Sequence, residues 1–208
     1  MAIENRSARK RKAIVTAAET AFLENGYLGT SMDEIATAAA VSKQTVYKHF
    51  SDKEQLFTEI IHATMGRVIA ELVGGATLTL TESDDVERDL VALARQLIAS
   101  IWHPDVLRLR RLVIGEAGRF PHLGEAYFKQ GFERGIAAVA TSIEQLAAAG
   151  RLQVDDPQLA AQHLAGLILW VPLNRAMFTG NDELPTDLDH FATSAVRAFL
   201  TGYAPQDS

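Results

Sequence analysis

Four side chains in the stretch 43–48 could bind nucleic acid. Lys43 and Lys48 carry the positive charge that neutralises phosphates. The amide of Gln44 can form two hydrogen bonds with adenine or bond other base edges, and Thr45 offers a hydroxyl and a methyl group for base contacts, including contact with a thymine methyl. The set predicts contacts with both the phosphates and the bases of DNA.

Two short helices joined by a tight turn are predicted to present these side chains. Ser31 and Glu34 have the spacing of a capping box, which begins the first helix, and Ser42 is placed to cap the second. Val46 and Phe50 are four residues apart and face the same side of the second helix. Burial of these two apolar residues turns the polar set outward.

Further phosphate contacts are expected around this pair of helices. Tyr47 can donate a hydrogen bond to a phosphate oxygen, and so can His49. Helix N-termini, where backbone N–H groups and the helix dipole attract anions, carry Thr30, Ser31, Ser42 and Lys53. A helical hairpin with a solvated polar face has the same spacing, so the spacing alone leaves both interpretations open.

The charge distribution favours the N-terminal end as the DNA-facing surface. Residues 1–12 hold five basic side chains against Glu4, and we interpret them as a basic arm. Residues 1–60 hold 8 of the 20 basic and 8 of the 26 acidic residues, so the remaining 148 residues carry the whole net charge of −6. An acidic body repels DNA and disfavours other docking orientations. A solvated basic tail is the alternative.

The residue pattern predicts helices along the whole chain, because it has no sustained alternation of apolar and polar residues of the kind typical of strands. Gly26 is predicted to end the first helix. Ser51 and Glu54 are predicted to form a second capping box at the start of the fourth helix. Gly74 and Gly75 are predicted to end the fourth helix, in a loop over 74–84. An all-α fold of about nine or ten helices follows. The expected helices are about 7–25, 31–39, 42–49, 52–73, 85–101, 104–118, a short one from 121, 132–149, 157–178 and 186–201.

Residues 9–60 resemble the DNA-binding domain of the tetracycline-repressor (TetR) family. The resemblance rests on Phe22, the Gly26-Tyr27 helix end, Thr30, Ile35-Ala36, Val41-Ser42, Val46-Tyr47-x-x-Phe50 and Lys53-Glu54. It implies that Lys43, Gln44 and Thr45 probe the major groove and that Thr30, Ser42, Tyr47, His49 and Lys53 contact phosphates. It also implies a three-helix domain over 1–55, with the helix-turn-helix at 31–50, and a larger helical domain over 56–208 for ligand binding and dimerisation.

The C-terminal region resembles the AefR-like subgroup of that family over residues 111–131 and 151–168. The resemblance implies a homodimer formed by the last two helices, about 157–179 and 186–201, and a small-molecule effector. Polar and aromatic residues on apolar helices are candidates for a mostly apolar effector pocket, although each alone is more often a core or surface residue. They are Trp102, Arg110, Glu116, Phe120, Tyr127, Phe128, His163, Trp170, Asn174, Met177 and Phe178.

The expected partners are double-stranded operator DNA and a small apolar or aromatic effector, and the expected function is repression in the cytoplasm. An activator and a sequence-independent DNA-binding protein are the alternatives. The chain has no cysteine, its six histidines are scattered singly, and its apolar stretches are too short to cross a bilayer. We therefore expect no catalytic residue, metal, cofactor or membrane contact. Pro172 is expected to kink or break its helix near Ile168.

Overall fold

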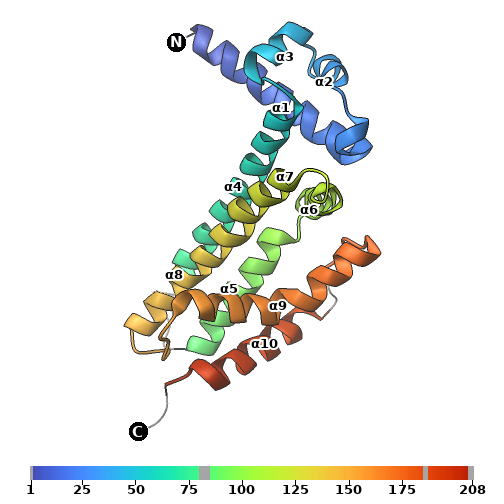
Figure 1. Cartoon of the computed structure of the whole chain (residues 1–208). Coiled ribbons are helices and arrows are strands. Elements are labelled where there is room, and N and C mark those ends of the chain that lie inside the picture. Colours follow the sequence, from blue (N-terminus) through green and yellow to red (C-terminus); the bar gives the residue numbers. More distant parts are fainter. Residues whose placement is uncertain (1, 80–84, 185–186, 206–208) are drawn as a thin grey trace. The chain divides into compact units, whose positions relative to one another are not determined.

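The computed structural model describes residues 2–79, 85–184 and 187–205, and this part of the chain is helical without strands. The predicted all-α fold is confirmed. The elements are α1 (Ala2–Gly29), α2 (Met32–Ala38), α3 (Lys43–His49), α4 (Lys53–Thr79), α5 (Val86–Ile101), α6 (Pro104–Glu116), α7 (Pro121–Tyr127), the π-helical η1 (Phe128–Glu133), α8 (Arg134–Ala148), α9 (Pro157–Thr179) and α10 (Leu188–Tyr203) (Figure 1).

The chain divides into two compact units. The first unit comprises residues 1–65 and 108–128, and the second comprises 66–107 and 129–208. The division therefore falls within α4, within α6 and next to the start of η1. None of the helices in the described part of the chain is long and apolar enough to span a membrane.

The first unit is built on an apolar core shared by α1, α2, α3 and α4. Helix α1 contributes one apolar side to this core, where Ile14, Ala18 and Phe22 are buried. Phe22 and Phe57 pack edge to face with ring centroids 5.0 Å apart, and Tyr27 packs 5.1 Å from Phe57. Such aromatic pairs add to the stability that burial of their area provides. This cluster fixes the platform on which α2 and α3 rest.

The second unit has its own core, to which α5, α8, α9 and α10 contribute. Helix α9 contacts α5, α8 and α10 (Figure 1). A buried ion pair, Arg151 Nη2 to Asp89 Oδ2 at 2.8 Å, joins the segment before α9 to α5. The side chain of Asp89 is only 3% exposed, so loss of Arg151 would leave a buried carboxylate whose remaining cation, Arg88, lies 4.0 Å away at an exposed position. The predicted starts of α5 and α9 are confirmed, since Asp85 and Asp156 cap them.

Two local predictions on helix ends are wrong. The basic residues 6–12 do not form an arm ahead of the first helix, because α1 begins at Ala2 and the good helix formers of this segment continue it. Gly74 and Gly75 do not end α4, which continues to Thr79. A glycine costs a helix only about 1 kcal/mol relative to alanine, which does not by itself end a long helix. The rest of the predicted loop, 80–84, lies outside the described residues.

The capping box predicted at Ser51 and Glu54 is also wrong. Helix α4 is capped one residue later, where Asp52 Oδ1 accepts from the N–H of Gln55 at 2.7 Å and Gln55 Oε1 accepts from the N–H of Ser51 at 2.7 Å. The hydrogen bonds that Asp52 accepts from the Gln55 N–H and from the Ser51 hydroxyl lower the pKa of Asp52, so the carboxylate stays charged at the helix N-terminus. Glu54 instead pairs with His122 at 3.0 Å.

Glycines end or interrupt the helices where the chain needs a positive φ. Gly26 interrupts α1 with φ 76° and ψ 169°, as predicted, although a further helical turn follows it to Gly29. Gly180 ends α9 with φ 67°. Helix α9 continues through Pro172, so the proline does not break it.

The turn between α2 and α3 contains a left-handed residue that is not glycine. Ala40 has φ 52°, and its N–H donates to the carbonyl of Thr37 at 3.1 Å while Val41 N–H donates to that of Ala36 at 3.0 Å. This is the helix-ending arrangement that usually places glycine at the left-handed position. An alanine there has a steric cost that glycine does not.

We predict that Ala40→Gly stabilises the first unit by about 1 kcal/mol, because glycine adopts this φ without the clash of Cβ. The expected result is a rise in Tm of roughly 2–4 °C, measured by thermal unfolding. The matched control is Ala38→Gly at an exposed helical position of α2, where the same change should destabilise. Equal effects at the two positions would contradict the prediction.

Candidate DNA-binding site

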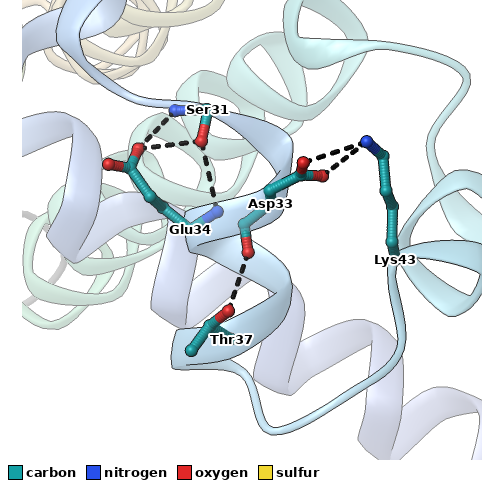
Figure 2. A network of polar contacts seen from close by, with 5 residues as sticks. All are labelled: Ser31, Asp33, Glu34, Thr37 and Lys43. Atoms are coloured by element: carbon teal, nitrogen blue, oxygen red, sulfur yellow. Dashed lines mark hydrogen bonds and ion pairs between the residues drawn. The ribbon is translucent and has the colours of Figure 1, made fainter.

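The turn and the caps place α2 and α3 as a helix-turn-helix. Ser31 caps α2, with Ser31 Oγ accepting from the N–H of Glu34 at 3.2 Å and Glu34 Oε2 accepting from the N–H of Ser31 at 2.7 Å (Figure 2). The predicted capping box is therefore confirmed. The N–H and the hydroxyl of Ser31 both donate to Oε2 of Glu34, and these two hydrogen bonds lower the pKa of Glu34 because they stabilise its carboxylate. Ser42 caps α3 by accepting from the N–H of Thr45 at 3.1 Å.

Burial of two residues orients α3. Val46 is fully buried and Phe50 is 1% exposed, as the spacing predicts, while Ile35 of α2 is also fully buried. The guanidinium of Arg11 lies 5.0 Å from the centroid of the Phe50 ring and pairs with Glu59 at 2.8 Å. Arg11 therefore covers the end of α3 and links α1 to α4.

The opposite side of α3 is polar and open to solvent. Lys43, Gln44 and Lys48 are exposed, and Tyr47 is 45% exposed. Thr45 and His49 are half-buried, and the Thr45 hydroxyl lies 2.8 Å from that of Ser42. These side chains lie together on one short helix, which is the arrangement that DNA-base readout requires.

Lys43 is held by a residue that the sequence analysis did not single out. Its ammonium lies 2.8 Å from Oδ1 and 3.0 Å from Oδ2 of Asp33, in the first turn of α2 (Figure 2). The hydrogen bond and the charge of Asp33 raise the pKa of Lys43. The two residues are ten positions apart across the turn, so no helical spacing in the sequence indicates the pair.

Two of the predicted phosphate-binding side chains hydrogen-bond backbone carbonyls of the protein itself. Thr30 is 2% exposed, and its hydroxyl donates to the carbonyls of Ala21 at 3.0 Å and Gly26 at 2.9 Å. The ammonium of Lys53 donates to the carbonyls of Tyr27 at 2.7 Å and Thr30 at 2.9 Å. Both side chains stabilise the connection between α1 and α2.

Lys53 also lies 4.6 Å from the centroid of the Tyr27 ring. Burial lowers the pKa of Lys53 and raises that of Tyr27, because it disfavours the charged form of each group. Phe120 packs against the same tyrosine, with ring centroids 4.9 Å apart. The start of α4, the end of α1 and the start of α7 therefore meet at one aromatic ring.

The candidate effector residues are divided between the two units. In the first unit Phe120 belongs to the aromatic cluster, Glu116 helps to line a groove of about 410 Å³ between α1 and α6, and Arg110 hydrogen-bonds the hydroxyl of Tyr127. Burial raises the pKa of Tyr127, and the Nε of Arg110 is buried without a hydrogen-bond partner in the described structure. Phe128 is half exposed.

In the second unit the candidates lie on different faces. Trp102 is buried at the end of α5, and its indole N–H has no acceptor among the described residues. Asn174 bonds the carbonyl of Trp170 at 2.7 Å, and Met177 is half-buried against the core. His163, Trp170 and Phe178 are exposed on α9. Within the described residues, His, Asp and Glu do not form a group of three that could hold a metal ion.

We predict that Lys53→Met lowers the free energy of unfolding of the first unit by about 1–3 kcal/mol, because two carbonyls lose a charged donor. The matched control is Lys48→Met, which removes the same group from an exposed position of α3 and should leave stability within about 0.5 kcal/mol. Urea unfolding followed by circular dichroism measures both. A Lys53→Met protein as stable as the unmodified one would show that these hydrogen bonds contribute little.

Two family models match the chain. The model described as bacterial regulatory proteins of the tetR family matches residues 14–60, and the model described as the C-terminal domain of AefR-like transcriptional repressors matches residues 88–205. The second match alone covers more than half of the chain. The helix-turn-helix lies within the first.

Similar proteins agree with these matches. A structure described as a TetR-family transcriptional regulator of Mesorhizobium loti MAFF303099 is 47% identical, with a TM-score of 0.89 over 96% of this chain and 99% of that one. The flavonoid-responsive regulator FrrA is 31% identical, with a TM-score of 0.81 over 96% and 100% of the two chains. The transcriptional activator FasR of Mycolicibacterium smegmatis is 33% identical over 94 residues, which are 45% of this chain and only 41% of FasR.

The matched proteins are described as regulators, and FasR is described as a transcriptional activator. The fold, the exposed polar side of α3 and both family models lead to the same assignment. The chain belongs to the TetR family of bacterial DNA-binding transcriptional regulators, with a C-terminal domain of the AefR-like type.

Proposed function

We propose that the protein is a repressor that binds a palindromic operator in the cytoplasm as a homodimer and leaves it when a small apolar or aromatic effector binds. The observation that carries this proposal is the arrangement of α3, whose apolar side is buried and whose polar side is exposed to solvent. The repressor description of the matching C-terminal model favours repression. Activation is the alternative, because FasR is an activator.

The proposed DNA-contacting residues are fewer than those predicted from the sequence. Gln44 and Thr45 read base edges with Lys43, while Tyr47 and Lys48 contact phosphates. Ser31, Ser42 and His49 complete the surface at the helix ends. Thr30 and Lys53 support it from inside, because their side chains donate to backbone carbonyls. In a dimer competent to bind, the two copies of α3 lie about 34–36 Å apart, one turn of DNA.

The exposed side of α9 supports the proposed homodimer. Leu159, Leu167, Trp170, Val171 and Phe178 recur at helical spacing along one side, and Trp170 and Phe178 are 71% and 87% exposed. Large apolar residues gathered on one exposed face are typical of an interaction surface. A second copy of the chain is the proposed occupant, since a single helix-turn-helix reads only half of a palindrome. Helix α10 adjoins α9 and is expected to contribute to the same interface.

The proposed effector site lies in the C-terminal domain, where Trp102 supplies a polar anchor. Its indole N–H is buried without a partner in the described part of the chain, and buried donors in native proteins are otherwise almost always satisfied. The surrounding core is apolar, so an aromatic molecule with an acceptor group matches it. The flavonoid response in the name of FrrA is consistent with an effector of that class.

Release from DNA follows from a difference in affinity between two conformations. In one conformation the two α3 helices have the wrong separation for the operator. An effector that binds this conformation more tightly lowers operator affinity, and the ratio of its affinities for the two conformations limits the size of the effect. Helix α4 is the proposed lever, because it is continuous and belongs to both units.

The DNA assignment is tested by Gln44→Ala and Tyr47→Ala. The probe is a duplex that the unmodified protein selects from a randomised pool. Loss of the amide should weaken binding to it by about 5- to 150-fold per half-site, because a good base contact provides about 1–3 kcal/mol of discrimination. Tyr47→Ala should weaken binding to selected and random duplexes alike. Gln145→Ala at an exposed position of α8 is the control, and unchanged affinity in both α3 variants would reject the assignment.

The dimer is tested by the double substitution Trp170→Ser and Phe178→Ser. Sedimentation equilibrium at micromolar concentration should find a dimer for the unmodified protein and a monomer for the variant, with equal helix content by circular dichroism. Ile114→Ser is the control, because Ile114 is 58% exposed but lies on α6 in the first unit. A monomeric unmodified protein, or a variant that remains dimeric, contradicts the proposed interface.

The effector anchor is tested by Trp102→Phe, with quercetin, a flavonoid, as the probe. Phenylalanine keeps an aromatic ring but removes the N–H, so quercetin affinity should fall about 5- to 10-fold by calorimetry. Affinity for the selected duplex without quercetin should not change. Trp170→Phe is the matched control, since Trp170 is exposed. Equal quercetin affinity in both variants would rule out the indole N–H as an anchor.

A further inference from the structure

The ion pair between Asp33 and Lys43 lies in the middle of the proposed DNA-binding surface. Two oxygens of one carboxylate lie 2.8 and 3.0 Å from the same ammonium, which donates a hydrogen bond to Oδ2 of Asp33 (Figure 2). The ammonium also lies 6.0 Å from the centroid of the Tyr47 ring. Lys43 is therefore held between α2 and its own helix instead of extending freely into solvent.

This pair changes what Lys43 offers to DNA. A free lysine binds any phosphate, and each phosphate contact releases counterions and adds sequence-independent affinity. The Asp33–Lys43 pair has no net charge, and its carboxylate repels a phosphate that approaches α2. The ammonium has three N–H donors, so it keeps a donor for DNA, and a guanine edge in the major groove offers an acceptor without a second negative charge nearby.

The pair is exposed, so its effect is on charge and orientation more than on stability. The side chains of Lys43 and Asp33 are 59% and 62% exposed. Exposed ion pairs contribute little to folding, and Asp33 also keeps a backbone role, since its carbonyl accepts from the Thr37 hydroxyl at 3.0 Å. A change of the carboxylate alone should therefore leave α2 folded.

We propose that Asp33 is a specificity-determining residue of the DNA-binding domain, which neutralises and positions Lys43 so that Lys43 serves base recognition instead of sequence-independent phosphate binding. This inference rests on the proposed placement of α3 in the major groove.

The test is Asp33→Asn in the full chain, since asparagine has the same shape without the charge. The first probe is a random-sequence duplex. Its affinity should rise about 3- to 10-fold at low salt, and the slope of log K against log salt should steepen by about 0.9 per subunit, as expected for one added phosphate contact. The second probe is the duplex selected by the unmodified protein, for which affinity should rise less, so that the ratio of the two affinities falls.

Two controls separate this effect from a general loss of negative charge. Glu24→Gln removes one charge from an exposed position on α1 and should not reproduce the change in slope. Adding Lys43→Met to Asp33→Asn should abolish the gain on the random duplex. Thermal unfolding checks that each variant remains folded.

The inference is overturned if Asp33→Asn leaves the random-duplex affinity unchanged, if Glu24→Gln produces the same rise, or if the rise persists without Lys43. Failure of the unmodified protein to select any sequence would reject the proposed function instead. The random-duplex measurement needs no operator, so the two failures are distinguishable.

Discussion

The proposed recognition surface depends on the burial of Val46 and Phe50. Helices α2 and α3 have only seven residues each, and helices of that length are not stable alone in water. Helix α3 persists because one side is buried in the core of the first unit, with Ile35 of α2 beside it. The same burial decides which residues face outward. The existence of α3 and the identity of its exposed side therefore depend on the same two residues.

Several cations of the first unit near α3 are engaged within the protein. Arg11 pairs with Glu59, Lys43 pairs with Asp33, and Lys53 donates to two carbonyls. The basic and acidic residues of positions 1–60 are equal in number, so the placement of charge matters more than its sum. When the cations of a surface are partly neutralised, the electrostatic contribution to its DNA affinity is smaller. Base contacts then contribute a larger share of that affinity.

Several features that depend on neighbouring residues could be predicted from the sequence, although the predicted cap of α4 is one residue too early, whereas features that depend on distant residues could not be predicted. The Ser31–Glu34 box and the interruption at Gly26 follow from local hydrogen bonds and φ values, and the structure confirms them. The pairing of Glu54 with His122 joins two helices, and no local pattern indicates it. No local pattern indicates either that the candidate effector residues are divided between the two units. Spacing identifies the face on which a residue of the candidate site lies, whereas its partner depends on how the helices pack.

Helix α9 shows how packing can override a local rule. Pro172 has no N–H, so the carbonyl of Ile168 loses its helical donor, yet the helix continues to Thr179. Ile168 is fully buried before the proline and Leu173 is 7% exposed after it, so the core holds both sides of the weakened turn. The opposite side of the same segment carries Trp170, which is exposed. The proline is therefore tolerated because one side of α9 is fixed by the chain's own core, which leaves the other side available to a partner.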